Sequence, residues 1–165
     1  PHARRRARGP DADRRCGRGW RVSDRHPCAY VLPHELTIPY VRSIQAAVKQ
    51  CSDAIEGMIG GGNWHGQHVG HYDMQAAHAE IDRATTALYD TIAATCPTAA
   101  DTTAALRCVR LARGAGHDAL LLSERWADGE CSRLVRDQLR LARYQACAAV
   151  ALADPSALPH LPTAE

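Results

Sequence analysis

The chain has 165 residues, a length that suits one domain with a sizeable core. Hydrophobic residues make up 45% of it and the formal net charge is +2, which excludes a wholly disordered chain and argues against a DNA-binding charge balance. Nineteen Arg accompany one Lys, and Phe is absent, a bias that indicates a GC-rich bacterial genome. Abundant Ala with few aromatic residues favours helices over sheets.

The seven cysteines include no Cys-x-x-Cys pair. We therefore expect reduced thiols in the cytoplasm, rather than a disulfide framework or a zinc knuckle. No stretch approaches the roughly 18 consecutive apolar residues of a membrane span, so we expect no membrane partner.

The N-terminal segment is strongly basic. Residues 1–26 carry nine Arg and three Asp, a net charge of +6, without apolar periodicity. We expect a disordered or extended arm over residues 1–37. It is either a basic arm that contacts nucleic acid or an acidic partner, or, for residues 1–21, non-native sequence. We favour the second interpretation because Val22 fits a GTG start codon.

Apolar residues then recur at spacings of three and four, which predicts consecutive helices. The first runs over residues 38–59, with Thr37 as N-cap and Pro39 in the first turn. The second runs over 71–95, after the glycine run at 60–62 that ends the first. The third runs over 99–127 on a seam of small residues, and Gly114 and Gly116 weaken it enough to permit a bend or break.

The fourth helix is predicted over residues 130–153. Its wide apolar arc should face the core, and comprises Leu134, Val135, Leu139, Leu141, Ala142, Ala146, Ala149 and Leu152. Residues 154–165, with three prolines, should form a loose tail. Four amphipathic helices joined by short turns predict an all-α fold, an antiparallel four-helix bundle over 38–153.

Four histidines, at positions 65, 68, 71 and 78, lie within fourteen residues. His78-Ala79-Glu80 matches the His-x-Glu half of the zinc deaminase signature, whose other half is Pro-Cys-x-x-Cys. That other half is missing, so we reject a deaminase. We expect positions 65 and 68 to lie in a loop.

A metal site within the bundle is the alternative for this stretch. Counting across the turn at Pro97 places His78 level with His117, and His71 level with Glu124. Imidazole and carboxylate groups on neighbouring helices bind zinc, iron or manganese. However, a core-facing seam on the third helix would turn His117 toward water. We therefore favour hydrogen-bonded seam histidines without a cofactor.

A basic stripe marks the fourth helix, where Arg133, Arg136, Arg140 and Arg143 repeat at spacings of three and four. It serves either nucleic acid or an acidic partner helix, or it is a solvated face with local ion pairs. We favour the solvated face, because the stripe has no aromatic residue for base stacking. Residues 27–97 carry −4 and residues 98–153 carry +2, an asymmetry that also permits self-association, aided by the seam of the first helix.

These patterns lead us to expect a small soluble accessory or interaction protein, non-enzymatic, that acts through a helix face on a protein partner or on a second copy. A metal-binding bundle is the first alternative, and a nucleic-acid-associated protein is the second. The one Cys/His pair that the geometry suggests, Cys51 with His78, would lie inside the bundle, where a thiol is usually inert.

Overall fold

Four long helices make up the computed structural model, which describes residues 34–60, 64–94, 100–124 and 129–163, without the side chains of 58–60, 64–71 and 129–131. They are α1 (His34–Gly60), α2 (Trp64–Ala93), α3 (Ala100–Glu124) and α4 (Gly129–Ala153), followed by a short 3₁₀ helix, η1 (Pro155–His160). No strand occurs in these ranges. The predicted all-α class is confirmed.

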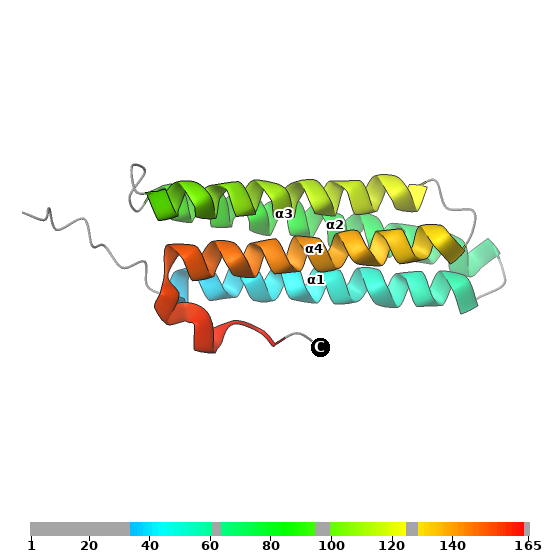
Figure 1. Cartoon of the computed structure of the whole chain (residues 1–165). Helices are drawn as coiled ribbons and strands as arrows, with labels where there is room; N and C mark the ends of the chain where they lie inside the picture. The colour runs from blue at the N-terminus through cyan, green and yellow to red at the C-terminus, as the bar shows by residue number, and fades with distance from the viewer. Residues whose placement is uncertain (1–33, 61–63, 95–99, 125–128, 164–165) are drawn as a thin grey trace, which may run out of the picture.

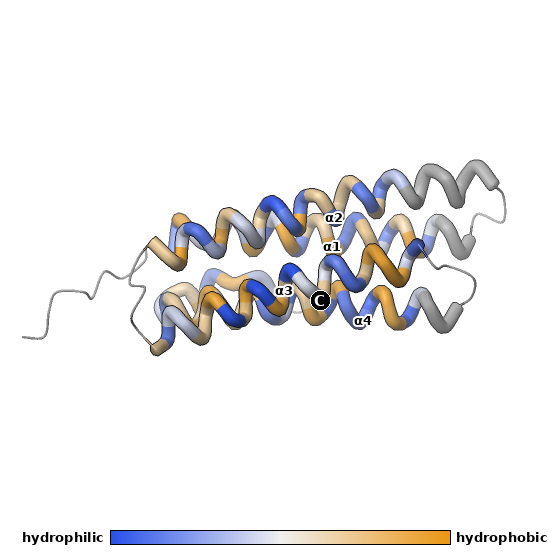
Figure 2. The backbone as a smooth tube through the Cα atoms, turned by 90° about the horizontal axis from the view of Figure 1, so that it is seen from above, coloured by the Kyte–Doolittle hydropathy of each residue, from blue (hydrophilic) through white to orange (hydrophobic). Residues whose placement is uncertain are grey.

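The helices form a bundle in which successive helices run in opposite directions (Figure 1). Each packs against its neighbour in sequence, and α4 returns to pack against α1. The α1–α2 hairpin therefore forms one layer and the α3–α4 hairpin the other, as the view from above shows (Figure 2). This arrangement follows from connections too short to carry the chain back to the end where it started.

The core consists of the apolar seams of the four helices. On α1 the predicted seam is buried as far as Ile55, so it is unavailable for self-association, contrary to expectation. On α3 four of the eight buried residues are alanines and most of the others are also small, which brings this helix close to its neighbours. The largest fully buried apolar side chains are Val41, Ile44, Ile55, Met74, Ile81, Leu88, Ile92, Val109, Val135, Leu139 and Val150.

The two glycines of α3 do not interrupt it, since the helix is continuous from Ala100 to Glu124. Gly116 is buried against α2, and a Cβ built there would lie 2.9 Å from Cγ2 of Ile81. A Cβ at Gly114 would meet nothing within 4 Å. Gly116 therefore permits the close approach of α3 to α2, and Gly114 does not have that role.

The beginning of α1 differs from the prediction. The helix starts at His34, and Thr37 is a buried residue inside it rather than its N-cap. The Thr37 hydroxyl donates a hydrogen bond to the carbonyl of His34 at 3.3 Å. The ring of His34 stacks on that of His160 in η1, with 4.3 Å between centroids, so a contact with the C-terminal segment supports this extra turn.

The C-terminal segment is ordered as well, so the predicted loose tail is wrong for residues 155–163. Asp154 caps η1 by accepting a hydrogen bond from the backbone N–H of Ser156 at 3.0 Å. Ala157 is fully buried, and η1 packs against both α1 and α4. Pro155 is compatible with η1 because it occupies the first position, where no N–H donor is needed, and Pro159 lies further along the same short helix.

The start of α2 also differs from the prediction. Its backbone is helical from Trp64, so His65 and His68 lie in a helix rather than in the predicted loop. The sequence signal is weak there because Gly66 and Gly70 lower the helix propensity and no apolar seam marks these turns. The predicted N-terminal arm up to residue 33 and the connection at 125–128 lie outside the described residues.

Candidate interaction face and histidine groove

The apolar arc of α4 is wider than the part of this helix that the core covers. Leu139 is buried, whereas Leu134 and Leu141 are each 41% exposed and Leu152 is 38% exposed. The prediction that the whole apolar arc of α4 faces the core is therefore wrong. A helix at one corner of a four-helix bundle buries only the arc that faces its neighbours, and these three leucines lie outside that arc.

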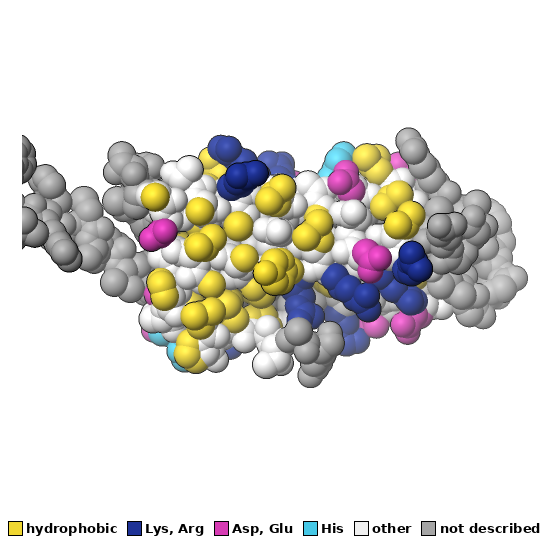
Figure 3. Space-filling view, viewed as in Figure 1, with side chains coloured by type: hydrophobic (Ala, Val, Ile, Leu, Met, Phe, Trp, Pro, Cys, Tyr) yellow, Lys and Arg dark blue, Asp and Glu magenta, His cyan; other side chains and the backbone are white. Residues whose placement is uncertain are grey.

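The neighbouring helix α3 also exposes leucines, since Leu111 is 48% and Leu121 is 43% exposed. A cavity of about 280 Å³ lies between the two helices and is lined by Asp118, Leu121, Leu122 and Gln138. The outward side of the α3–α4 hairpin shows many hydrophobic side chains over both helices (Figure 3). We call this surface the α3/α4 face and define it by Ala104, Arg107, Leu111, Asp118 and Leu121 on α3, and by Leu134, Gln138, Leu141, Gln145, Ala148 and Leu152 on α4.

The outward sides of α1 and α2 differ in character. In the described part of each, one large hydrophobic side chain is exposed, Leu36 on α1 and Tyr72 on α2. Local ion pairs lie there instead, such as Lys49 Nζ with Asp53 at 2.9 Å. The exposed leucines are therefore concentrated on the hairpin of α3 and α4.

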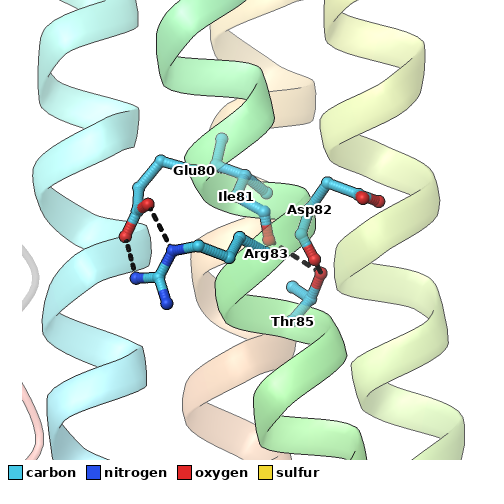
Figure 4. Close-up of polar contacts among 5 residues, drawn as sticks. All are labelled: Glu80, Ile81, Asp82, Arg83 and Thr85. Atoms are coloured by element: carbon cyan, nitrogen blue, oxygen red, sulfur yellow. Dashed lines mark hydrogen bonds and ion pairs between the residues drawn. The ribbon is translucent and has the colours of Figure 1, made fainter.

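The middle of α2 illustrates how its polar residues are satisfied (Figure 4). Arg83 donates two hydrogen bonds to the Glu80 carboxylate, at 2.7 and 2.6 Å, and this contact lowers the pKa of Glu80. Thr85 is buried in the seam and donates to the carbonyl of Ile81 at 2.7 Å, with a second contact to the carbonyl of Asp82. These bonds explain how a threonine occupies a core position.

Asp82 points to the other side of α2, toward α3 (Figure 4). There a groove of about 390 Å³ is lined by His78, Asp82, Arg110, Arg113, Gly114 and His117. The rings of His78 and His117 are 5.9 Å apart between centroids and tilted by 51°. The prediction that these two residues lie at the same level is therefore confirmed. We call this feature the histidine groove.

Most other polar groups of the histidine groove are engaged with each other or with nearby residues. Arg113 Nε donates to Asp82 Oδ1 at 2.6 Å. Arg110 donates to the Tyr89 hydroxyl at 2.7 Å and lies 5.3 Å from the centre of its ring. Desolvation lowers the pKa of His78, with the nearby Asp82 raising it and His117 lowering it further. His78 is thus biased toward the neutral form that can accept a proton or a metal ion.

The predicted four-residue metal site is brought together only in part. His78 and His117 are neighbours, and His117 is exposed, as expected for a residue turned away from the seam. The side chain of His71 lies outside the described residues, and Glu124 is exposed at the end of α3. Among described side chains, no group of three or more His, Cys, Asp or Glu is placed to hold a metal ion. Metal binding remains a prediction.

The basic stripe of α4 contacts other parts of the same chain. Arg136 lies 3.7 Å from Glu56 of α1, and Arg140 lies 3.4 Å from Asp137. Arg143 donates to the carbonyl of Thr163 at 2.9 Å, and Arg133 is exposed. These contacts favour a solvated face with local pairs, and nucleic-acid binding by the stripe remains a prediction.

Cys51 carries no sign of an activated thiol. Its side chain is 2% exposed, and burial raises its pKa to about 11. The thiolate is the nucleophilic form of cysteine, and at neutral pH this residue holds its proton.

None of the described helices has the length and apolarity needed to cross a membrane. No protein-family model, curated protein or solved structure matches this chain.

Proposed function

We propose that this protein is a small helical-bundle interaction protein that acts by binding a protein partner through the α3/α4 face, rather than by catalysis. The observation that supports the proposal is the set of leucines that α3 and α4 expose on one side of the molecule. Large apolar surfaces bordered by polar groups are typical of protein interaction sites.

The composition of the face adds to this argument. The six α4 positions that define the face are uncharged, and its charges come from Arg107 and Asp118 on α3 and from the exposed Asp137 at its border. A helix side that served only to face water would carry charges, as the outward sides of α1 and α2 do. The cavity beside Leu121 also offers a concave place for an apolar side chain of a partner.

A photo-crosslinking amino acid at position 141, with a matched chain carrying it at the exposed position 46 of α1, tests the proposal in the cells that produce the protein. We expect an adduct of discrete mass from position 141 and none from position 46. Adducts from neither position, or equal adducts from both, would contradict a binding role for the α3/α4 face.

A second candidate function, metal binding, is favoured by the contact of His78 with His117. Imidazole nitrogens bind zinc at about 2.0–2.1 Å, so two rings with centroids 5.9 Å apart are able to share one ion. The lowered pKa of His78 supports binding as well, because only the neutral ring is a ligand. Further ligands would have to come from water, from the partner or from residues such as His71.

Metal content by mass spectrometry, on protein purified without chelator, tests this second candidate. Close to one zinc, iron or manganese ion per chain is expected, with loss of the ion in both His78→Ala and His117→Ala. An absence of metal, together with a melting temperature that added zinc does not change, would exclude the site.

A further inference from the structure

The α3/α4 face has an internal symmetry in its arrangement of residues. On α3, Arg107 and Asp118 are equally distant from a point between residues 112 and 113. On α4, Leu134 and Leu152 are equally distant from residue 143. The cavity that Asp118 and Gln138 both line places these two positions at the same level of the antiparallel helices, to within about one helical turn. By that register, the two midpoints lie at the same level of the bundle.

This symmetry would make the face complementary to itself. A second copy rotated by half a turn, about an axis at this level and across the helices, would lay α3 antiparallel on α3 and α4 antiparallel on α4. Arg107 of each copy would then meet Asp118 of the other, and Leu134 of each would meet Leu152 of the other. An interface of this kind, in which residue i contacts j and j contacts i, is the usual contact of a symmetric dimer.

The charged residues on the α3/α4 face favour a second copy of this chain, rather than an unrelated protein, as its partner. Arg107 and Asp118 are both exposed, and neither forms an ion pair with another residue in the part of the chain that the structure describes. They are eleven residues apart on one helix, about 16 Å, so they do not neutralise each other within a chain. In the two-fold arrangement each meets an opposite charge.

The apolar residues of the face fit the same arrangement. Leu152 of the second copy would approach Leu134 beside the cavity that Leu121 and Leu122 line. Small residues lie where close contact is needed, with Ala104 opposite Leu121 on α3, and Ala148 opposite Gln138 on α4. In both of these pairs a small residue faces a larger one, which lets two helical layers interdigitate.

We propose that the partner of the α3/α4 face is a second copy of this chain, and that the two copies form an antiparallel two-fold dimer held by reciprocal Arg107–Asp118 ion pairs and by the exposed leucines. This inference rests on the proposed function, since it names the partner of the same face. The face is about 27 Å long and two helices wide, which corresponds to roughly 1,100 Å² for both copies together, just above the minimum of about 1,000 Å² for a biological interface. An interface near this lower limit suits a weak dimer whose population depends on concentration.

Sedimentation equilibrium of the full chain with reductant, over about 1–100 μM, tests the proposal. We expect the mass to rise from 17.9 kDa toward twice that value. Arg107→Asp and Asp118→Arg should each weaken the dimer at least about tenfold, because like charges then meet, and the double variant should recover most of the affinity. Arg42→Asp on α1 and Asp90→Arg on α2, at exposed positions away from the face, are the matched controls and should not change it.

The outcomes separate this inference from the proposed function. A chain that stays monomeric at all concentrations overturns the dimer, and so does a dimer that neither Arg107→Asp nor Asp118→Arg weakens. An adduct from position 141 that contains a different protein, with no self-adduct, also overturns it while supporting the proposed function. If position 141 gives no adduct at all, both the dimer and the proposed binding role of the α3/α4 face are wrong. Since all four substituted side chains are exposed, circular dichroism should confirm that each variant is folded.

Discussion

Gly116 is the residue on which the contact between α2 and α3 depends most closely. Its Cα faces the fully buried Ile81, and the nearest atom to a methyl group placed at this position, Cγ2 of Ile81, belongs to a stiff β-branched side chain. A larger residue would therefore force the two helices apart or push Ile81 out of its rotamer. The sequence shows a glycine here but cannot show what faces it.

Gly116→Ala should lower the free energy of unfolding by about 1–2 kcal/mol, because overpacking outweighs the gain of roughly 1 kcal/mol in helix propensity. Gly114→Ala, two positions earlier at an open site, should raise it by up to about 1 kcal/mol. Denaturation in urea at low protein concentration measures both. Equal effects in the two variants would show that α3 does not approach α2 as closely as described.

His78 should make the stability depend on pH. Its pKa in the folded protein is below the usual 6.5, because burial and His117 disfavour the charged ring more than Asp82 favours it. As pH falls through about 6.5, His78 takes up a proton in the unfolded chain before it does so in the folded protein. The contribution of His78 to the free energy of unfolding is therefore fully present above about pH 6.5. It decreases below that value until the pH has passed the lowered pKa of His78 in the folded protein.

His78→Gln should remove this part of the pH dependence, seen in urea unfolding between about pH 5 and pH 7.5. His117→Gln should instead raise the pKa of His78, because one repulsive charge is lost, and NMR titration of the His78 ring reports that shift directly. A His78 pKa at or above the usual value in the native protein would contradict this account.

At the scale of the element, η1 depends on its cap and on its contact with α1. The Asp154 carboxylate is 1% exposed, and one of its oxygens accepts hydrogen bonds from the N–H and the hydroxyl of Ser156. The other oxygen, Oδ2, has no hydrogen-bond partner among the described residues. The cap therefore stabilises the start of η1, although it leaves one buried acceptor unsatisfied.

Asp154→Ala should destabilise the protein by about 1–2 kcal/mol, since it removes the cap. Asp154→Asn should lose less, because its amide oxygen can still accept from Ser156. Hydrogen exchange should accelerate in η1 and also over residues 34–40 of α1, against which η1 packs. Faster exchange confined to η1 would indicate that α1 starts at His34 without support from the C-terminal segment.

The two sides of α4 should respond differently to the same substitution. Leu139→Ala should lower the free energy of unfolding by about 2–5 kcal/mol, because it leaves a cavity in the core. Leu141→Ala, on the exposed side, should change it by less than about 0.5 kcal/mol at concentrations where the chain is monomeric. Thermal unfolding checks both, and a loss of several kcal/mol at Leu141 would mean that the α3/α4 face is part of the core.

At the scale of the whole molecule, the seams of the first three helices predict the core well. Their spacing of three and four places apolar residues on one side of each helix, and the structure buries most of them, although Cys108 and Leu122 on α3 are only partly buried. The fourth helix is where this reasoning fails. Its arc includes Leu134, Leu141 and Leu152, and periodicity cannot distinguish a leucine that faces the core from one that faces a partner.

The candidate sites were predicted to different extents. Counting residues across a turn is enough to bring His78 to His117, because antiparallel helices of equal rise keep a fixed register. The same counting cannot give the ion pair of Arg113 with Asp82 or the stacking of Arg110 on Tyr89, since these depend on how each helix is rotated about its axis. The α3/α4 face was missed because it needs both the register and the rotation of two helices.

The sequence by itself determined the class of the fold, the number of long helices and most of the buried seams, because the period of an α-helix is a local property that apolar residues record directly. Only the tertiary structure decided where α1 begins, that η1 is ordered, that Gly116 faces Ile81 and that five leucines of α3 and α4 remain exposed. These features depend on which surfaces meet, and contacts between segments distant in sequence leave no periodic signal in either of them.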